Sequence, residues 1–332
     1  MVQRISPDDK HLKWYGCVSL ERTKHGVKPW RIFREDRDLY YPMLMERAQK
    51  SSGVRLAFIS NTTSLACDIV PWHEPTTIDI CCDEELVNTV SLEEGAARFT
   101  VSGLPAKKKL VEIWWAPKGH TTLKSLKIDN GASLTPFIDR RPKWVTYGSS
   151  VTQCSGAFSP TLTWPAVAAR NCGLNLTNLG MSGECVMDVM IARVMRDIPA
   201  DFLSMCVGPN IYGYNGLNER TFRSSLLGFV EVVREKHPNA PFVLLSCIYY
   251  PTGDTIKNAA GFTMNEMRAE VKAAADTLRR HGDKNIHYVS GLEILGEEHA
   301  NRLPDKSHPD GNGYKIMGEN FTKKVARKYF VK

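Results

Sequence analysis

Short apolar runs follow one another through the first 136 residues and predict strand after strand. They are separated by Pro, Gly and Asn clusters and lie at 54–59, 64–70, 77–82, 97–101, 109–115 and 123–128. Only residues 43–50 have a pattern that suits a helical turn or two. Six or more short strands without crossover helices are typical of an antiparallel β-sandwich, which we predict for this part of the chain.

The pattern changes at Lys143, where strand-like runs begin to alternate with helical segments. The apolar runs now lie at 144–147, 174–179, 202–207, 242–248 and 286–289. Such alternation predicts a parallel sheet that is covered on both faces. The segment Arg140-Arg141-Pro142 marks the change. We assign residues 1–138 to an N-terminal β-sandwich domain and residues 139–332 to a C-terminal α/β domain.

Capping residues mark the helices of the second part. Asn218 is placed to cap a helix that ends before Pro238. Thr263, with Glu266 three residues later, predicts a capping box for the next helix, and Gly282 lies just past its end. A further helix closes the chain.

The composition is that of an ordinary globular protein, with 42% hydrophobic and 24% charged residues. No run approaches about 18 apolar residues, so no membrane span is expected. The N-terminal residues include acidic side chains where a signal peptide needs an apolar run, so we expect a cytoplasmic protein. The basic residues behind the formal charge of +7 are dispersed, and we therefore expect no nucleic-acid partner.

The cysteines and histidines do not suggest a metal site. There are nine cysteines and no C-x-x-C motif, and most cysteines lie singly in apolar runs, which predicts buried, reduced thiols. The adjacent Cys81 and Cys82 should point to opposite faces of a strand, and the histidines lack ligand spacing. We predict no metal and no cofactor.

Polar residues gather where the predicted strands of the second part end. In chain order these places are Gly148-Ser149-Ser150, Gly180-Met181-Ser182-Gly183, Gly208-Pro209-Asn210 and, before the last helix, Asp305-Lys306-Ser307-His308. Ligands of a doubly wound sheet bind beyond the carboxyl ends of its strands, so the four segments should meet at one edge. Together they offer a serine nucleophile, polar donors, and a histidine base with a carboxylate.

These four segments resemble the motifs of the SGNH hydrolases, the GDSL-type esterase and lipase superfamily, in the family order. Gly148-Ser149-Ser150 resembles the Gly-Ser-Ser branch of the family, which implies that Ser150 is the nucleophile. The resemblance further implies Gly183 and Asn210 as oxyanion-hole residues and Asp305 and His308 as the remaining triad members. It covers the chain from about Lys143 to the C-terminus, and it implies a three-layer αβα, flavodoxin-like domain with a parallel sheet.

Longer strings such as TWPAVAARNCGLNLTNLG resemble the subgroup that carries an N-terminal, jelly-roll-like β-sandwich before the esterase domain. The front domain of that subgroup has a Gly-x-Asp-Leu-Tyr signature. Its place is taken here by the segment TIDIC at 77–81, in which only Asp79 matches.

The chemistry of these residue types agrees with the resemblance. His308 can take the Ser150 proton during attack on an ester carbonyl, while Asp305 holds the imidazole in the correct tautomer. The backbone N–H groups of Ser150 and Gly183 and the Asn210 amide can stabilise the oxyanion.

We therefore expect a serine esterase that hydrolyses a short-chain, acetyl-type ester of a small hydroxylated metabolite or sugar through an acyl-enzyme. One alternative is an acyltransferase that uses the same Ser-His-Asp site with an alcohol or amine acceptor. Another is a carbohydrate-binding protein with an inactive scaffold, although the complete set of site residues argues against it. Tyr212, Tyr214, Tyr249 and Tyr250 follow predicted strands and are candidates for the substrate pocket.

Overall fold

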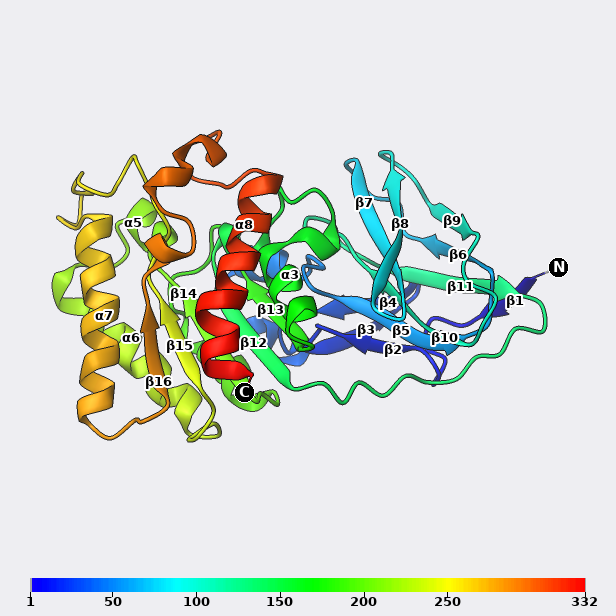
Figure 1. Cartoon of the computed structure of the whole chain (residues 1–332), viewed down its shortest axis with the longest axis horizontal. Coiled ribbons are helices and arrows are strands. Elements are labelled where there is room, and N and C mark those ends of the chain that lie inside the picture. The colour runs from blue at the N-terminus through cyan, green and yellow to red at the C-terminus, as the bar shows by residue number, and fades with distance from the viewer. Residues whose placement is uncertain (1, 332) are drawn as a thin grey trace. The chain divides into compact units, whose positions relative to one another are not determined.

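In the computed structural model, which describes residues 2–331, the chain folds into two compact units (Figure 1). The sandwich unit comprises the chain up to Asp38 together with Ala48–Arg140 and Phe158–Thr161. The α/β unit comprises Leu39–Arg47, Arg141–Ala157 and the chain from Leu162 onward. The expected division at 138/139 places Leu39–Arg47 in the sandwich domain and Phe158–Thr161 in the α/β domain, whereas in the structure each belongs to the other unit.

Two antiparallel sheets form the sandwich unit, as predicted. The first has the order β3-β4-β11-β6-β9, with β1 also paired to β11, and the second has the order β2-β5-β10-β7-β8. The strands of the first sheet are β1 (Val2–Ile5), β3 (Ser19–Thr23), β4 (Gly26–Trp30), β6 (Ser64–Ile69), β9 (Arg98–Ser102) and β11 (Leu123–Asp129). Those of the second are β2 (Lys13–Tyr15), β5 (Arg55–Ser60), β7 (Thr76–Cys82), β8 (Glu85–Leu92) and β10 (Lys109–Trp114).

A single apolar cluster from both sheets forms the core of this unit. Leu56 and Phe58 of β5 and Cys67 of β6 are among its fully buried members. In contrast, the first five residues of β8 are exposed. A strand whose side chains face solvent lacks an apolar run, which is why the sequence pattern did not reveal β8.

The sheet of the α/β unit is parallel throughout, in the order β13-β12-β14-β15-β16. Its strands are β12 (Lys143–Gly148), β13 (Asn175–Gly180), β14 (Phe202–Cys206), β15 (Phe242–Leu245) and β16 (Ile286–Val289). This is the flavodoxin-like order, and it confirms the expected fold class.

Helices α2 to α8 lie between and after these strands in the chain, and α1 precedes them. The α-helices are α1 (Pro42–Ala48), α2 (Ser150–Gln153), α3 (Trp164–Asn171), α4 (Val189–Asp197), α5 (Pro209–Tyr214), α6 (Glu219–Arg234), α7 (Met264–Arg280) and α8 (Gly311–Phe321). The short 3₁₀ segments are η1 (Arg34–Leu39), η2 (Pro160–Leu162), η3 (Gly291–Glu293) and η4 (Glu297–Arg302), and the π-helix η5 (Thr322–Phe330) follows α8.

The predicted helix starts of α6 and α7 are confirmed. The Asn218 side chain accepts hydrogen bonds from the first turn of α6, and Thr221 completes a capping box with it. Thr263 and Glu266 form the expected capping box at the start of α7. These bonds satisfy backbone N–H groups that have no partner inside the helix.

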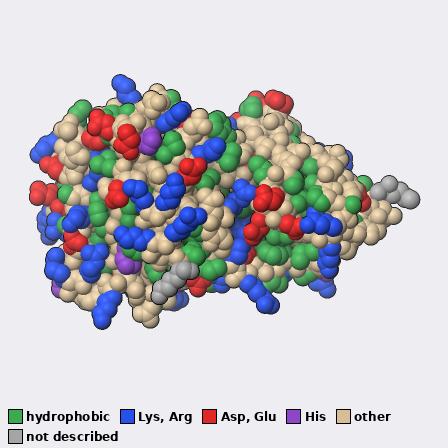
Figure 2. All heavy atoms as spheres, in the orientation of Figure 1, with side chains coloured by type: hydrophobic (Ala, Val, Ile, Leu, Met, Phe, Trp, Pro, Cys, Tyr) green, Lys and Arg blue, Asp and Glu red, His purple; other side chains and the backbone are tan. Residues whose placement is uncertain are grey.

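Within residues 2–331, no helix combines the length and the apolar character that a membrane span requires. On the face drawn in Figure 2, Lys and Arg side chains are interspersed with Asp and Glu. The excess positive charge is therefore not gathered into one patch on that face.

Asp79 of β7 is a fully buried carboxylate that holds the short segment Phe158–Thr161 within the sandwich unit. Its Oδ2 atom accepts hydrogen bonds from Ser159 Oγ (2.7 Å), Thr161 N (2.8 Å) and Thr161 Oγ1 (2.6 Å). Its other oxygen accepts from Thr89 Oγ1 (2.6 Å). These four hydrogen bonds satisfy both oxygens of the buried side chain, so this aspartate fixes where the segment lies.

We predict that Asp79→Asn destabilises the protein. The amide NH₂ group would replace an oxygen that accepts hydrogen bonds, and it would then face donors that it cannot accept from. Hydrogen bonds to charged groups contribute about 1.5–3 kcal/mol each, and we expect a loss of about 2–4 kcal/mol in the free energy of unfolding. Urea unfolding followed by tryptophan fluorescence measures it. The exposed Asp83→Asn is the matched control and should change stability far less. Equal unfolding midpoints for Asp79→Asn and the wild type would contradict this account.

Candidate active site

Ser150 is placed by a tight turn at the carboxyl end of the central strand β12. The strand ends at Gly148, and Ser150 is the first residue of α2. A Cβ atom at position 148 would lie 2.1 Å from Thr152 Oγ1, so only glycine lets the strand end approach α2 this closely. The turn therefore presents Ser150 at the edge where ligands of this fold bind.

The two neighbouring serines have different partners. Ser149 is buried at 4% exposure, and its hydroxyl caps α2 by accepting from the Val151 N–H at 3.4 Å. Ser150 is only partly buried, and its Oγ lies 2.8 Å from Nε2 of His308. Of the two hydroxyls, that of Ser150 is therefore the one with a base beside it.

Asp305 orients His308 from the loop before α8. Its Oδ2 lies 2.7 Å from His308 Nδ1, while its Oδ1 accepts from the backbone N–H groups of Ser307 (2.9 Å) and His308 (2.6 Å). Burial acts to raise the pKa of Asp305, but the hydrogen bonds from His308 and Ser307 outweigh it and the pKa is lowered. Asp305 is thus a carboxylate at neutral pH and can hold the proton on Nδ1, which leaves Nε2 to accept from Ser150.

The loop after β13 carries Gly183 and is held by hydrogen bonds on both sides. Met181 N–H donates to Gly148 O (2.7 Å), and Ser182 N–H donates to Gln153 Oε1 (3.1 Å). Arg47 Nε donates to the Ser182 carbonyl (3.0 Å). Gly183 has φ +80°, a left-handed conformation that favours glycine. These bonds hold the loop in one conformation, which is the condition that a backbone donor to an oxyanion would have to meet.

Asn210 lies in the first turn of α5, directly after Gly208 and Pro209. Its Oδ1 accepts a hydrogen bond from the Cys185 N–H at 3.1 Å. Because the carbonyl end of the amide is used in this way, the NH₂ end is oriented as a donor. The contact also joins α5 to the loop of Gly183.

Three residues that hold the site were not recognised in the sequence. Gln153 and Arg47 bind the loop of Gly183, and Asn178 joins β13 to α2 through Thr152 O (2.8 Å) and Gly180 N (2.7 Å). Gln153 and Asn178 lie next to the motifs, but neither residue type by itself indicates a role in the site. Arg47 is about 100 residues away in sequence from the motifs, in α1, and no local pattern could have indicated it.

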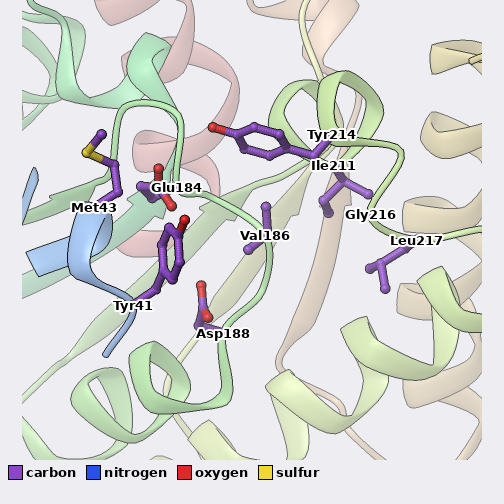
Figure 3. Close-up of a pocket in the computed structure, with 9 residues that line it drawn as sticks. All are labelled: Tyr41, Met43, Glu184, Val186, Asp188, Ile211, Tyr214, Gly216 and Leu217. Carbon is purple, nitrogen blue, oxygen red and sulfur yellow. The ribbon is translucent and has the colours of Figure 1, made fainter. Parts of the chain in front are cut away.

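A cavity of about 570 Å³ adjoins this loop within the α/β unit (Figure 3). Tyr41 and Met43 line it from the segment Leu39–Arg47, Glu184 and Asp188 from the stretch after Gly183, and Tyr214 from α5. A Cβ atom at Gly183 would be 3.6 Å from the Tyr214 hydroxyl, so the cavity borders the candidate oxyanion hole.

Of the four predicted pocket tyrosines, Tyr214 lines this cavity and the other three do not. Tyr212 donates to the Ile256 carbonyl (3.0 Å) and packs edge-on against Tyr250. Tyr249 donates to Glu297 (3.5 Å). A role for Tyr212, Tyr249 and Tyr250 in binding substrate stays a prediction.

Within residues 2–331, no three or more His, Cys, Asp or Glu side chains are grouped so that they could hold a metal ion.

Family models match both parts of the chain. Residues 142–326 match the GDSL-like lipase/acylhydrolase family, and residues 12–121 match the N-terminal domain of SsfX3. The chain belongs to the GDSL-like lipase/acylhydrolase family. The expected SGNH-type enzyme acting on acyl esters is thereby confirmed. A search of the curated proteins finds no match.

Solved structures of this architecture include an acyltransferase and esterases. The salicylyl-acyltransferase SsfX3 from a tetracycline biosynthetic pathway is 35% identical, with a TM-score of 0.92 over 98% of this chain and 97% of that one. A GDSL-like lipase from Bacteroides ovatus is 18% identical (TM-score 0.83, covering 100% and 99%). A family two carbohydrate esterase from Clostridium thermocellum is 15% identical (TM-score 0.67, covering 96% and 98%). The last two comparisons show a shared fold.

We predict that the two serines respond differently to an organophosphate probe. Ser150→Ala should lose labelling and nearly all turnover, because it removes the hydroxyl beside His308. Ser149→Ala should keep labelling and lose only the stabilisation of a helix cap, about 1 kcal/mol. Mass spectrometry of the labelled protein measures the difference. Labelling that survives in Ser150→Ala and disappears in Ser149→Ala would reverse the assignment.

Proposed function

We propose that this protein is a serine esterase that hydrolyses a short-chain, acetyl-type ester of a small hydroxylated metabolite or sugar. The observation that carries the proposal is the contact between Ser150 Oγ and His308 Nε2 at 2.8 Å, with Asp305 on the far side of the imidazole. This arrangement makes a hydroxyl into a nucleophile without a metal or a cofactor.

In the first half of the reaction, Ser150 Oγ attacks the ester carbonyl while His308 Nε2 takes its proton. Asp305 stabilises the imidazolium that forms. The tetrahedral intermediate collapses when His308 returns the proton to the leaving alcohol, and an acyl-enzyme remains. In the second half, water attacks the acyl group with His308 again as base, which releases the acid and restores Ser150.

Three donors are proposed for the oxyanion: the backbone N–H groups of Ser150 and Gly183 and the side-chain amide of Asn210. The hydrogen bonds around Ser182 and from Cys185 to Asn210 support this assignment, because they hold both donor-bearing segments in place. Donors fixed in advance need no reorganisation when charge develops, and this is the source of their catalytic effect.

A second candidate function is acyl transfer, in which an alcohol or amine replaces water in the second half-reaction. The observation that favours it is the 35% identity over nearly the whole chain to a salicylyl-acyltransferase. The same triad and oxyanion donors serve both reactions. The alternative of an inactive carbohydrate-binding scaffold is not supported, because Ser150 Oγ and Asp305 Oδ2 both lie within hydrogen-bonding distance of the His308 ring.

Product analysis separates hydrolysis from transfer. The protein is given 4-nitrophenyl esters of increasing acyl length, with and without an added alcohol or amine, and the fate of the acyl group is measured by mass spectrometry. An esterase yields mainly the free acid, with the shortest acyl groups preferred. A new ester or amide as the main product would establish transfer, and failure to cleave any of the esters would refute both functions.

We predict that Asn210→Ala lowers kcat by about 10²- to 10³-fold and changes KM only modestly, as for removal of one oxyanion donor. Steady-state kinetics on 4-nitrophenyl acetate measure both constants. Asn215→Ala, which changes an asparagine beyond the end of the same helix, is the control. A raised KM with unchanged kcat in Asn210→Ala would show instead that Asn210 only binds substrate.

A further inference from the structure

The cavity beside the oxyanion loop contains an acidic side chain whose burial is otherwise unexplained. Glu184 is only 7% exposed, and its carboxylate forms no hydrogen bond with any of the described residues. It lines the cavity directly after Gly183. The carboxylate oxygens are not among the fully buried unpaired polar atoms of residues 2–331, so they stay accessible from the cavity. A carboxylate that is largely removed from bulk water without gaining hydrogen bonds is destabilised, which favours a ligand that supplies a partner.

A second carboxylate, that of Asp188, lines the same cavity. Burial raises the pKa of Glu184 and the charge of Asp188 adds to this effect, while Arg47 opposes it. Burial also raises the pKa of Asp188. Arg47 is already bound to the Ser182 carbonyl and to Glu46, outside the cavity lining. The two carboxylates thus repel each other across the cavity, and a positive charge bound between them would offset this repulsion.

The other walls fit an organic cation. In Figure 3 the Tyr41 and Tyr214 rings flank the space near Glu184, and the Asp188 carboxylate points into it. Val186 and Ile211 give apolar walls. Aromatic faces and carboxylates bind ammonium groups, whereas neutral hydroxyl groups would not relieve the repulsion between two carboxylates. With no third metal-binding side chain, the cavity also lacks a ligand set for a metal ion among residues 2–331.

We infer that this cavity is a substrate subsite for a positively charged ammonium group, with Glu184 as its specificity-determining residue. The inference rests on the proposed function, because it places the cationic part of an ester next to the carbonyl that Ser150 attacks. The cation belongs either to the alcohol part or to the acyl part of the ester. Both sources have the same chemistry, and the experiment separates them.

The test compares cationic esters with neutral esters of the same shape. For the alcohol part the pair is acetylcholine and 3,3-dimethylbutyl acetate. For the acyl part it is the 4-nitrophenyl esters of 4-(trimethylammonio)butanoate and 5,5-dimethylhexanoate. In one of the two pairs the wild type should prefer the cationic ester by about 10-fold or more in kcat/KM, since a buried carboxylate attracts a cation strongly. Equal or lower kcat/KM for the cationic ester in both pairs would overturn the inference.

In the Glu184→Gln variant, the ratio of kcat/KM for the cationic ester to kcat/KM for the neutral ester should fall close to one. The control variant Glu231→Gln, which changes an exposed carboxylate on α6, should keep the wild-type ratio. The ratio is used because a general loss of activity cancels from it. A ratio in Glu184→Gln equal to that of the wild type would refute the role of this residue.

Direct binding keeps the inference testable if the variant does not fold or if no ester is cleaved. Calorimetry on the Ser150→Ala protein should detect choline and give at least about 10-fold weaker binding of the neutral 3,3-dimethylbutanol. Choline binding without ester cleavage would refute the esterase and keep the cation site. Ester cleavage without choline binding and without a preference for the cationic ester would keep the esterase and refute the cation site.

Discussion

The hydrogen bond between the Ser150 hydroxyl and the His308 imidazole is the interaction on which the proposed chemistry of the α/β unit depends. Ser150 is placed by the end of β12, and His308 by a loop just before α8, more than 150 residues later. A shift of an ångström at either end would break the bond. The close approach at Gly148, the cap at Ser149 and the three bonds that Asp305 makes to its own loop keep both ends fixed.

Much of this arrangement could be predicted because it is encoded locally. The apolar runs at β12 to β16 mark a buried parallel sheet, and glycines and serines at the strand ends mark the edge where ligands bind. The spacing of Asp305 and His308 lets one turn bring carboxylate and imidazole to 2.7 Å. The choice between the adjacent serines came from family resemblance, and the structure gives its physical basis in the buried cap at Ser149.

What could not be predicted depends on contacts between distant parts of the sequence. The segment Leu39–Arg47 belongs to the α/β unit, where it brings Arg47 to Ser182 and Tyr41 to the cavity. A chain that began near residue 139 would lack these side chains. Phe158–Thr161 belongs to the sandwich unit through Asp79, the one residue of the expected front-domain signature that the sequence retains. Neither segment has a hydrophobic pattern that shows which unit it belongs to, so local sequence could not predict either assignment.

Passage of the acyl group through Ser150 can be followed directly by rapid acid quenching and peptide mass spectrometry. The wild type is mixed with 4-nitrophenyl acetate, and the acetylation of each peptide is followed against the release of 4-nitrophenol. We expect an acetyl group on Ser150 that forms no later than 4-nitrophenol appears and decays as acetate is released. An acetyl group that instead forms and decays at the catalytic rate on another residue, with Ser150 unmodified, would contradict it.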